Sequence, residues 1–216
     1  MSFDPVATAG LVAREVRSGS RNGAATKIVI ARRTYDATQT DLWDALTNPD
    51  RLPRWFLPVS GDLRVGGRYQ LEGNAGGVVE HCTEPASFAV TWEYGGMLSW
   101  LQVTLIPAGE RTTLQLAHED LREAGRWRQF GPGAVGIGWD LSLLGLGRHL
   151  ETTATVNPED AAAFVASPEG AELIREAAAG WADAATAAGD DPDSAQQAAA
   201  RTVAFYTNGP GTEVSS

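Results

Sequence analysis

Apolar side chains recur at every second position in three segments in the middle of the chain, residues 88–94, 101–105 and 112–118. A period of two is typical of a strand that buries one face. Clusters of glycine and proline separate these segments and favour turns between them. Further strands are expected at 27–35, 63–64, 68–73 and 78–82. The pattern predicts six or seven antiparallel strands, enough to curl around a helix.

The segment 131–150 has a helical period instead. Its apolar stripe should face the sheet and consists of Trp139, Leu143, Leu146 and Leu150, broadened by Leu144. Glycines in a helix cost about 1 kcal/mol each relative to alanine, but they let a neighbouring backbone or a ligand approach closely. Close packing is the simpler interpretation of the four in this segment, which are Gly136, Gly138, Gly145 and Gly147.

Residues 41–56 predict two short helices, at about 38–46 and 49–55. Leu42, Ala45 and Leu46 share one helical face. The run Asn48-Pro49-Asp50 places a capping residue, a proline and an acid in the order that favours a helix start. Pro53 should end the second helix early and direct Trp55 and Phe56 away from it.

This order of elements resembles the SRPBCC superfamily, also called START-like or Bet v 1-like. Within it, the chain is most similar to bacterial proteins related to the activator of the ninety-kilodalton heat-shock protein ATPase (AHSA-type). The resemblance covers roughly residues 27–150 and rests on Ala31–Thr47, Asn48-Pro49-Asp50, Arg54-Trp55-Phe56, Gly61–Tyr69 and Val90–Tyr94. It implies an α+β helix-grip fold, in which a curved antiparallel sheet wraps around a long helix. No catalytic motif accompanies the matching positions, and the superfamily mixes carriers, enzymes and co-chaperones.

Extensions are expected on both sides of this domain. Residues 1–26 should form a short helix through about Ala13, an edge strand at 14–17 and a turn at 18–23. Residues 151–206 hold 19 alanines, and three cap-proline-acid signals predict an all-helical extension with helices at about 158–166, 168–188 and 192–206. Trp181 and the pair Phe205–Tyr206 should be buried, either against residues 27–150 or in a homodimer. Residues 207–216 are expected to be a disordered tail.

The charge is unevenly distributed along the chain. Residues 1–150 carry 16 acidic and 15 basic side chains, whereas residues 151–216 carry 11 acidic and 2 basic ones. This balance argues against nucleic-acid binding, which needs clustered lysine and arginine. An acidic partner-binding face is one interpretation of the extension, and a solvated helix surface is the simpler one. No apolar run is long enough to cross a membrane. A single cysteine, Cys82, is typical of a cytoplasmic protein. A small buried hydrophobe is the simpler interpretation of this residue, and a reactive thiol is the other.

Few residues suggest chemistry. His81, His118 and His149 do not have a metal-ligand spacing, and no phosphate loop or nucleophile motif occurs, so we expect neither a metal nor a cofactor. His118 should point into the interior because it alternates in phase with Leu114 and Leu116. A hydrogen-bonded structural histidine is one interpretation, and a ligand contact or an acid or base is the other.

The aromatic residues suggest a cavity between the sheet and the long helix, although they could also fill that space. Polar groups expected there are His118, Glu72 or Arg68. The candidate cavity residues are Trp55, Phe56, Tyr69, Trp92, Tyr94, Trp100, Leu114, Leu116, His118, Trp139 and Leu143.

Three functions remain open. The first is non-catalytic binding of a small hydrophobic ligand. The second is an enzyme of the polyketide cyclase or aromatase kind, which the absence of a clear acid–base pair disfavours. The third is a co-chaperone-like protein-interaction module, which the family resemblance alone suggests.

Overall fold

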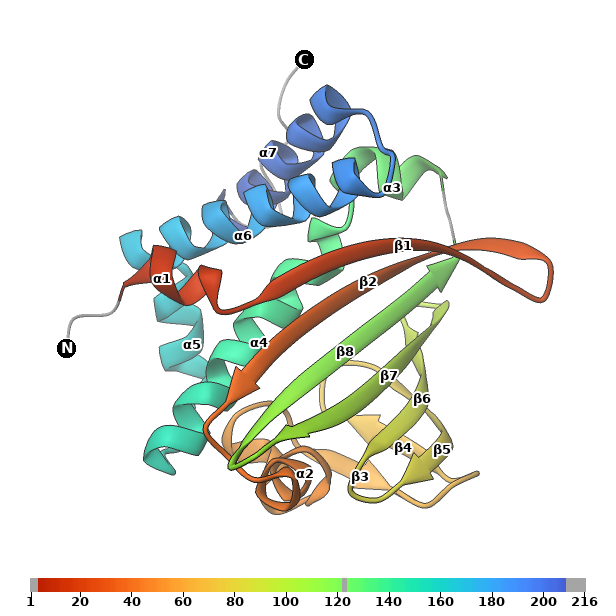
Figure 1. The fold of residues 1–216 in the computed structure, drawn as a ribbon, viewed down its shortest axis with the longest axis vertical. Coiled ribbons are helices and arrows are strands. Elements are labelled where there is room, and N and C mark those ends of the chain that lie inside the picture. The colour runs from red at the N-terminus through yellow and green to blue at the C-terminus, as the bar shows by residue number, and fades with distance from the viewer. Residues whose placement is uncertain (1–3, 122–123, 209–216) are drawn as a thin grey trace.

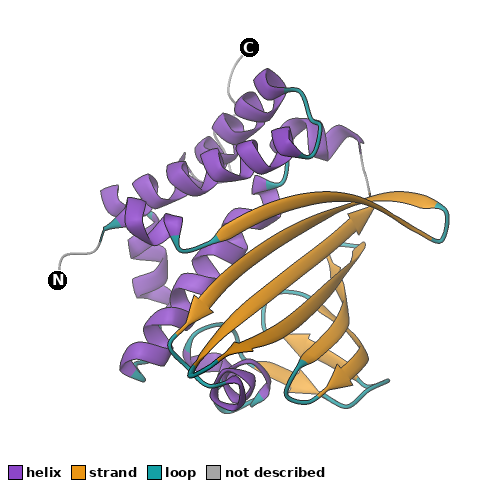
Figure 2. Cartoon of the chain, viewed as in Figure 1, coloured by secondary structure: helices purple, strands orange, loops and turns teal. Residues whose placement is uncertain are grey.

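The computed structural model describes residues 4–121 and 124–208, which form an eight-stranded antiparallel sheet that curves around a long helix (Figure 1, Figure 2). The strand order is β1-β2-β8-β7-β6-β5-β4-β3. The strands are β1 (Ala13–Arg21), β2 (Ala24–Tyr35), β3 (Val59–Gly61), β4 (Arg68–Leu71), β5 (Gly76–Thr83), β6 (Ser87–Tyr94), β7 (Met97–Ala108) and β8 (Arg111–Leu121). The helices are α1 (Pro5–Gly10), α2 (Gln39–Thr47), the 3-10 helix η1 (Leu52–Arg54), α3 (Ala124–Phe130), α4 (Gly133–Thr152), α5 (Pro158–Val165), α6 (Pro168–Ala187) and α7 (Pro192–Asn208). This is the α+β helix-grip fold predicted from the sequence.

The central strands bury alternate residues, as their pattern predicts. In β8, Leu114 and Leu116 are buried, whereas Gln115 between them is only half-buried. Leu116 is aligned with Val103 of β7 on one side and with Ala31 of β2 on the other, and all three are buried. These aligned positions give the sheet one continuous apolar face. The core of the protein lies between that face and α4.

The glycines of α4 lie where other parts of the protein come close to this helix. A Cβ atom at Gly136 would lie 2.3 Å from the ring of Trp181, and one at Gly147 would lie 2.6 Å from the guanidinium of Arg33. At Gly145 the carbonyl oxygen of Trp55 would be 3.0 Å away. Close packing is therefore the reason for these glycines, as the sequence suggested.

The C-terminal helices pack along β1 and on the side of α4 that the sheet leaves open (Figure 1). Asp140 of α4 lies at the centre of this interface, where its carboxylate accepts hydrogen bonds from Arg14 Nη2 at 2.7 Å and from Trp181 Nε1 at 2.7 Å. Burial raises the pKa of Asp140, although the Arg14 guanidinium opposes that rise. Arg14 of β1, Asp140 of α4 and Trp181 of α6 thus form one buried polar cluster. Farther along the same interface, Lys27 Nζ of β2 donates to Asp190 Oδ1 at 3.1 Å.

Several local predictions need correction. Residues 18–21 continue β1 instead of forming a turn, because they pair with Ala24–Lys27, and only residues 22–23 form the turn. Residues 63–64 lie outside the strands, and residues 48–51 form a turn, so that the second short helix is only η1. Helix α3 was not predicted from the sequence. Cys82 is exposed and not a buried hydrophobe.

The C-terminal anchors behave differently from one another. Trp181 is buried as predicted, but the prediction was wrong for Phe205, which is 51% exposed with its ring near Phe130 and Tyr206. Tyr206 is half-buried. Helix α7 continues to Asn208, two residues into the stretch expected to be disordered. The rest of that expected tail, 209–216, lies outside the described residues.

Candidate functional site

A cavity of about 310 Å³ lies between the apolar face of the sheet, the segment from α2 to η1, and α4. We call it the apolar chamber. The sheet contributes mainly aliphatic side chains, among them Val79, Val90, Leu101, Val103, Leu114 and Leu116. The aromatic side chains that line it are Trp43, Trp55, Phe56, Tyr69, Phe88, Trp92 and Trp139. Besides the indoles, the lining residues with polar side chains are Thr47, Ser142, Tyr69, Cys82 and Glu84.

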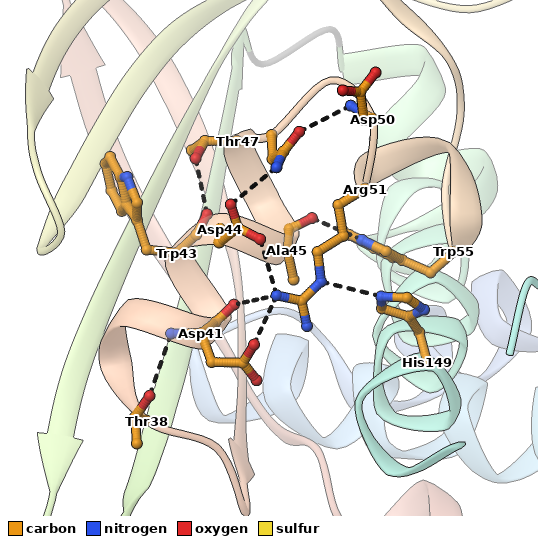
Figure 3. A network of polar contacts seen from close by, with 11 residues as sticks. Thr38, Asp41, Trp43, Asp44, Ala45, Thr47, Asp50, Arg51, Trp55 and His149 are labelled. Atoms are coloured by element: carbon orange, nitrogen blue, oxygen red, sulfur yellow. Dashed lines mark hydrogen bonds and ion pairs between the residues drawn. The ribbon is translucent and has the colours of Figure 1, made fainter. Parts of the chain in front are cut away.

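The α2–η1 segment is held against α4 by a polar network centred on Arg51 (Figure 3). Arg51 Nη1 contacts Asp41 Oδ1 at 2.6 Å and Asp44 Oδ2 at 3.0 Å, and its Nε donates to His149 Nε2 at 3.2 Å. Since this histidine nitrogen accepts, the proton of a neutral ring lies on Nδ1, which is 3.1 Å from the carbonyl oxygen of Ala154. His149 thus links the end of α4 to the helical wall of the chamber.

Two further contacts shape this wall. Asn48 and then Arg51 donate hydrogen bonds to Asp44 and lower the pKa of its carboxyl group. The indole Nε1 of Trp55 donates to the carbonyl oxygen of Ala45 at 2.8 Å (Figure 3). The ring of Trp55 also stacks on Phe56 at the wall of the chamber, with ring centroids 5.4 Å apart.

His118 points into the interior, as its position in β8 predicts, and both of its ring nitrogens are engaged. Trp139 Nε1 can only donate, so His118 Nδ1 accepts this hydrogen bond at 3.1 Å. The proton of the neutral ring is then on Nε2, which donates to Ser99 Oγ at 2.8 Å, and Ser99 donates in turn to the carbonyl oxygen of Trp92 at 3.2 Å. Burial lowers the pKa of His118 to about 4, and the charge of Arg126 acts in the same direction. His118 is consequently neutral at neutral pH.

A second cavity, of about 300 Å³, lies beside the first, and we call it the polar chamber. Its lining residues with polar side chains include Asn74, Tyr94, Ser99, His118, Asp120, Arg126, Ser142 and Tyr206. Phe56, Trp92 and Trp139 line both chambers. The ring of Trp139 lies 6.2 Å from that of Phe56 and 5.3 Å from that of Trp92, measured between centroids. These three rings form an aromatic partition between the chambers.

The structure brings together most of the side chains selected from the sequence. Those that line the apolar chamber are Trp55, Phe56, Tyr69, Trp92, Leu114, Leu116, Trp139 and Leu143. His118 and Tyr94 line the polar chamber instead, and Tyr94 is half exposed. Whether any of these residues contacts a ligand stays a prediction.

Trp100 lines neither chamber, which corrects its selection. It lies on the opposite face of the sheet, where the guanidinium of Arg21 is 4.2 Å from the centroid of its ring. The alternation of β7 gives the reason, because Leu101 points inward and its neighbour must point outward. Arg68 and Glu72 also lie outside the chambers, and Arg68 pairs with Glu93 at the surface.

Among the lining residues of the apolar chamber that were not selected from the sequence are Trp43 and Ser142. Trp43 lies at the edge of the apolar face of α2, and Ser142 lies in α4 beside Leu143, so helical periodicity was the available signal. Among the described residues, no three His, Cys, Asp or Glu side chains are grouped as a metal site would require. The described helices include none that is both long and apolar enough to cross a membrane.

Comparison with known proteins identifies relatives of this architecture. The family model described as Activator of Hsp90 ATPase homolog 1-like protein matches residues 36–151. No curated protein matches the chain. The crystal structure of CalU16 from Micromonospora echinospora is similar with a TM-score of 0.66 and 29% identity, over 81% of this chain and 98% of CalU16. The solution structure of CalU16 gives a TM-score of 0.68 and 28% identity, over 82% of this chain and 97% of that one.

A third structure is similar in fold alone. DynU16, a protein in the dynemicin biosynthetic locus, has a TM-score of 0.53 and 22% identity, over 59% of this chain and 48% of DynU16. The similarity to CalU16 covers more of the chain than the family model does, so it includes residues outside 36–151.

Proposed function

This chain belongs to the family of Activator of Hsp90 ATPase homolog 1-like proteins, and from that premise we propose that it binds a small hydrophobic molecule in the apolar chamber without transforming it. The observation that carries the proposal is the chamber itself. Its volume of about 310 Å³ lies at the lower end of the range of roughly 300–1,000 Å³ that is typical of small-molecule sites. A lining made almost entirely of aliphatic side chains and aromatic rings favours a flat apolar ligand.

The three hydroxyl groups of the chamber support binding over catalysis. The hydroxyls of Thr47 and Ser142 donate to carbonyl oxygens of their own helices, at 2.8 Å in each case. The hydroxyl of Tyr69 donates to the carbonyl oxygen of Thr91 at 2.8 Å. These protons are therefore already engaged, and such groups fix the orientation of a ligand more readily than they transfer a proton.

His118 supports the same conclusion from the other side of the partition. A general base works best when its pKa lies near the working pH. Burial holds the pKa of His118 at about 4, and both nitrogens are hydrogen-bonded within the protein. His118 is thus a positioning residue for Trp139, whose ring forms a wall of the chamber.

The uncharged fluorescent probe N-phenyl-1-naphthylamine tests the proposal. We expect its emission to rise and saturate with wild-type protein. Val103 is buried and lines the chamber, so Val103→Trp should fill part of the space and weaken binding at least tenfold. Gln102 is the exposed neighbour of Val103 on the same strand, and Gln102→Trp is the matched control that should bind like wild type.

Two results would contradict the proposal. Equal binding by the two tryptophan variants, with both folded by circular dichroism, would place the probe outside the chamber. Turnover of an added bicyclic or tricyclic polyketide by the wild-type protein would favour the cyclase alternative over simple binding.

A further inference from the structure

The polar chamber differs from the apolar chamber in the chemistry of its lining. One wall is the aromatic partition of Phe56, Trp92 and Trp139, which presents ring faces and edges. The lining of the same chamber includes the carboxylate of Asp120 and the guanidinium of Arg126. The chamber therefore combines charged donors and acceptors with rings on which an aromatic ligand can stack.

Ser99 supplies a buried acceptor in this chamber. Its Oγ accepts from His118 Nε2 and donates to the carbonyl oxygen of Trp92. A hydroxyl oxygen has two lone pairs, so one acceptor position remains after these contacts. The neighbouring His118 cannot supply this position, because its Nδ1 already accepts from Trp139.

The C-terminal extension completes the chamber. Tyr206 of α7 lines it, and a Cβ atom at Gly138 of α4 would lie 3.4 Å from the hydroxyl of Tyr206. Burial raises the pKa of this phenol, so it stays protonated at neutral pH. The chamber is thus built from the sheet, α3, α4 and α7, and it is incomplete without a helix that lies outside the matched family segment.

We propose that the polar chamber is a second binding site, which takes a planar aromatic molecule carrying a hydroxyl group. The ring lies against Trp92 and Trp139. The hydroxyl proton is donated to Ser99, and the hydroxyl oxygen accepts from Arg126. This site is distinct from the apolar chamber and goes beyond the function proposed for it.

Isothermal titration with 2-naphthol, and with 2-methoxynaphthalene as the analogue that lacks the donor, tests the inference on the full chain. We expect the wild-type protein to bind 2-naphthol roughly fivefold more tightly, the effect of one hydrogen bond. Ser99→Ala should remove this preference. Ala134 lines the polar but not the apolar chamber, so Ala134→Phe should abolish 2-naphthol binding there.

The reciprocal variant separates this inference from the proposed function. Val103→Trp should leave the binding of 2-naphthol unchanged while it weakens that of N-phenyl-1-naphthylamine, and Ala134→Phe should do the reverse. If Val103→Trp abolishes 2-naphthol binding and Ala134→Phe does not, the second site is refuted. If 2-naphthol does not bind while the binding of N-phenyl-1-naphthylamine is still weakened by Val103→Trp, only the second site is refuted. If N-phenyl-1-naphthylamine does not bind while 2-naphthol does, the proposed function is refuted and the second site is retained. Ser99→Ala keeps the test decisive if Ala134→Phe does not fold, because an unchanged preference for 2-naphthol would overturn the inference.

Discussion

Neutral His118 makes the stability of the protein depend on pH in a defined window. Its pKa is about 4 in the folded protein, against an ordinary value of 6.5, because the ring is buried. A histidine whose pKa is lowered by folding contributes stability that is fully present above its unfolded pKa and is lost as pH falls toward its folded pKa. The difference of about 2.5 between the two pKa values corresponds to a contribution of roughly 3 kcal/mol to the free energy of unfolding. About 2.5 kcal/mol of this contribution is lost when the pH falls from about 7.5 to about 4.5.

The variant His118→Asn isolates this contribution. Its amide oxygen can accept from Trp139 Nε1 as His118 Nδ1 does, but the side chain does not titrate. Urea unfolding at about pH 7.5 and about pH 4.5 should show a loss of free energy of unfolding that is about 2.5 kcal/mol larger for wild type than for the variant. His81 is exposed, so His81→Asn is the control and should lose as much stability as wild type. An equal loss in wild type and His118→Asn would refute the assignment of a buried, neutral His118.

Three further predictions concern packing. Asp140→Ala should lower the free energy of unfolding by roughly 3–5 kcal/mol, measured in urea, because it leaves the buried guanidinium of Arg14 without its carboxylate. Asp62→Ala removes an exposed ion pair with Arg64 and should leave the stability unchanged. Gly136→Ala should lower the free energy of unfolding by about 1–3 kcal/mol in the same assay, because its new methyl group would meet a buried indole ring. Gly138→Ala is the control and should be tolerated, because the nearest atom would be 3.4 Å from the new methyl group. Equal effects of the two variants would contradict the packing given for α4. A chain ending at Glu151 should melt at lower temperature and aggregate more readily, because α4 loses its contacts with α6 and α7. An unchanged melting temperature and solubility would show that the last three helices are an independent appendage.

The regular part of the fold was predictable because local patterns of apolar, polar and capping residues specify it. Alternation located β6, β7 and β8, and the cap-proline-acid signals located the starts of α5, α6 and α7. The extent of β1 was not predictable in this way. Residues 18–21 have the composition of a turn, but pairing with β2 keeps them extended. Tertiary pairing thus overrode local composition.

The candidate site was predictable only where one strand decides the direction of a side chain. The period of β8 correctly placed His118 in the interior, and the same reasoning applied to β7 would have excluded Trp100. The polar chamber could not be derived, because Arg126 and Tyr206 reach it from separate helices. Their meeting depends on how α3 and α7 pack, and no local period encodes that arrangement.

The cluster of Arg14, Asp140 and Trp181 joins segments that a ribosome produces early, midway and late. When Arg14 emerges, neither of its partners has been made. When α4 is complete, Asp140 can meet Arg14, but the indole that covers them both is still to come. While residues 141–181 are being made, the nascent chain therefore carries this charge pair without its indole cover. The cluster can be completed only once α6 has left the exit tunnel, so the native packing of α4 depends on residues 168–187 having been made.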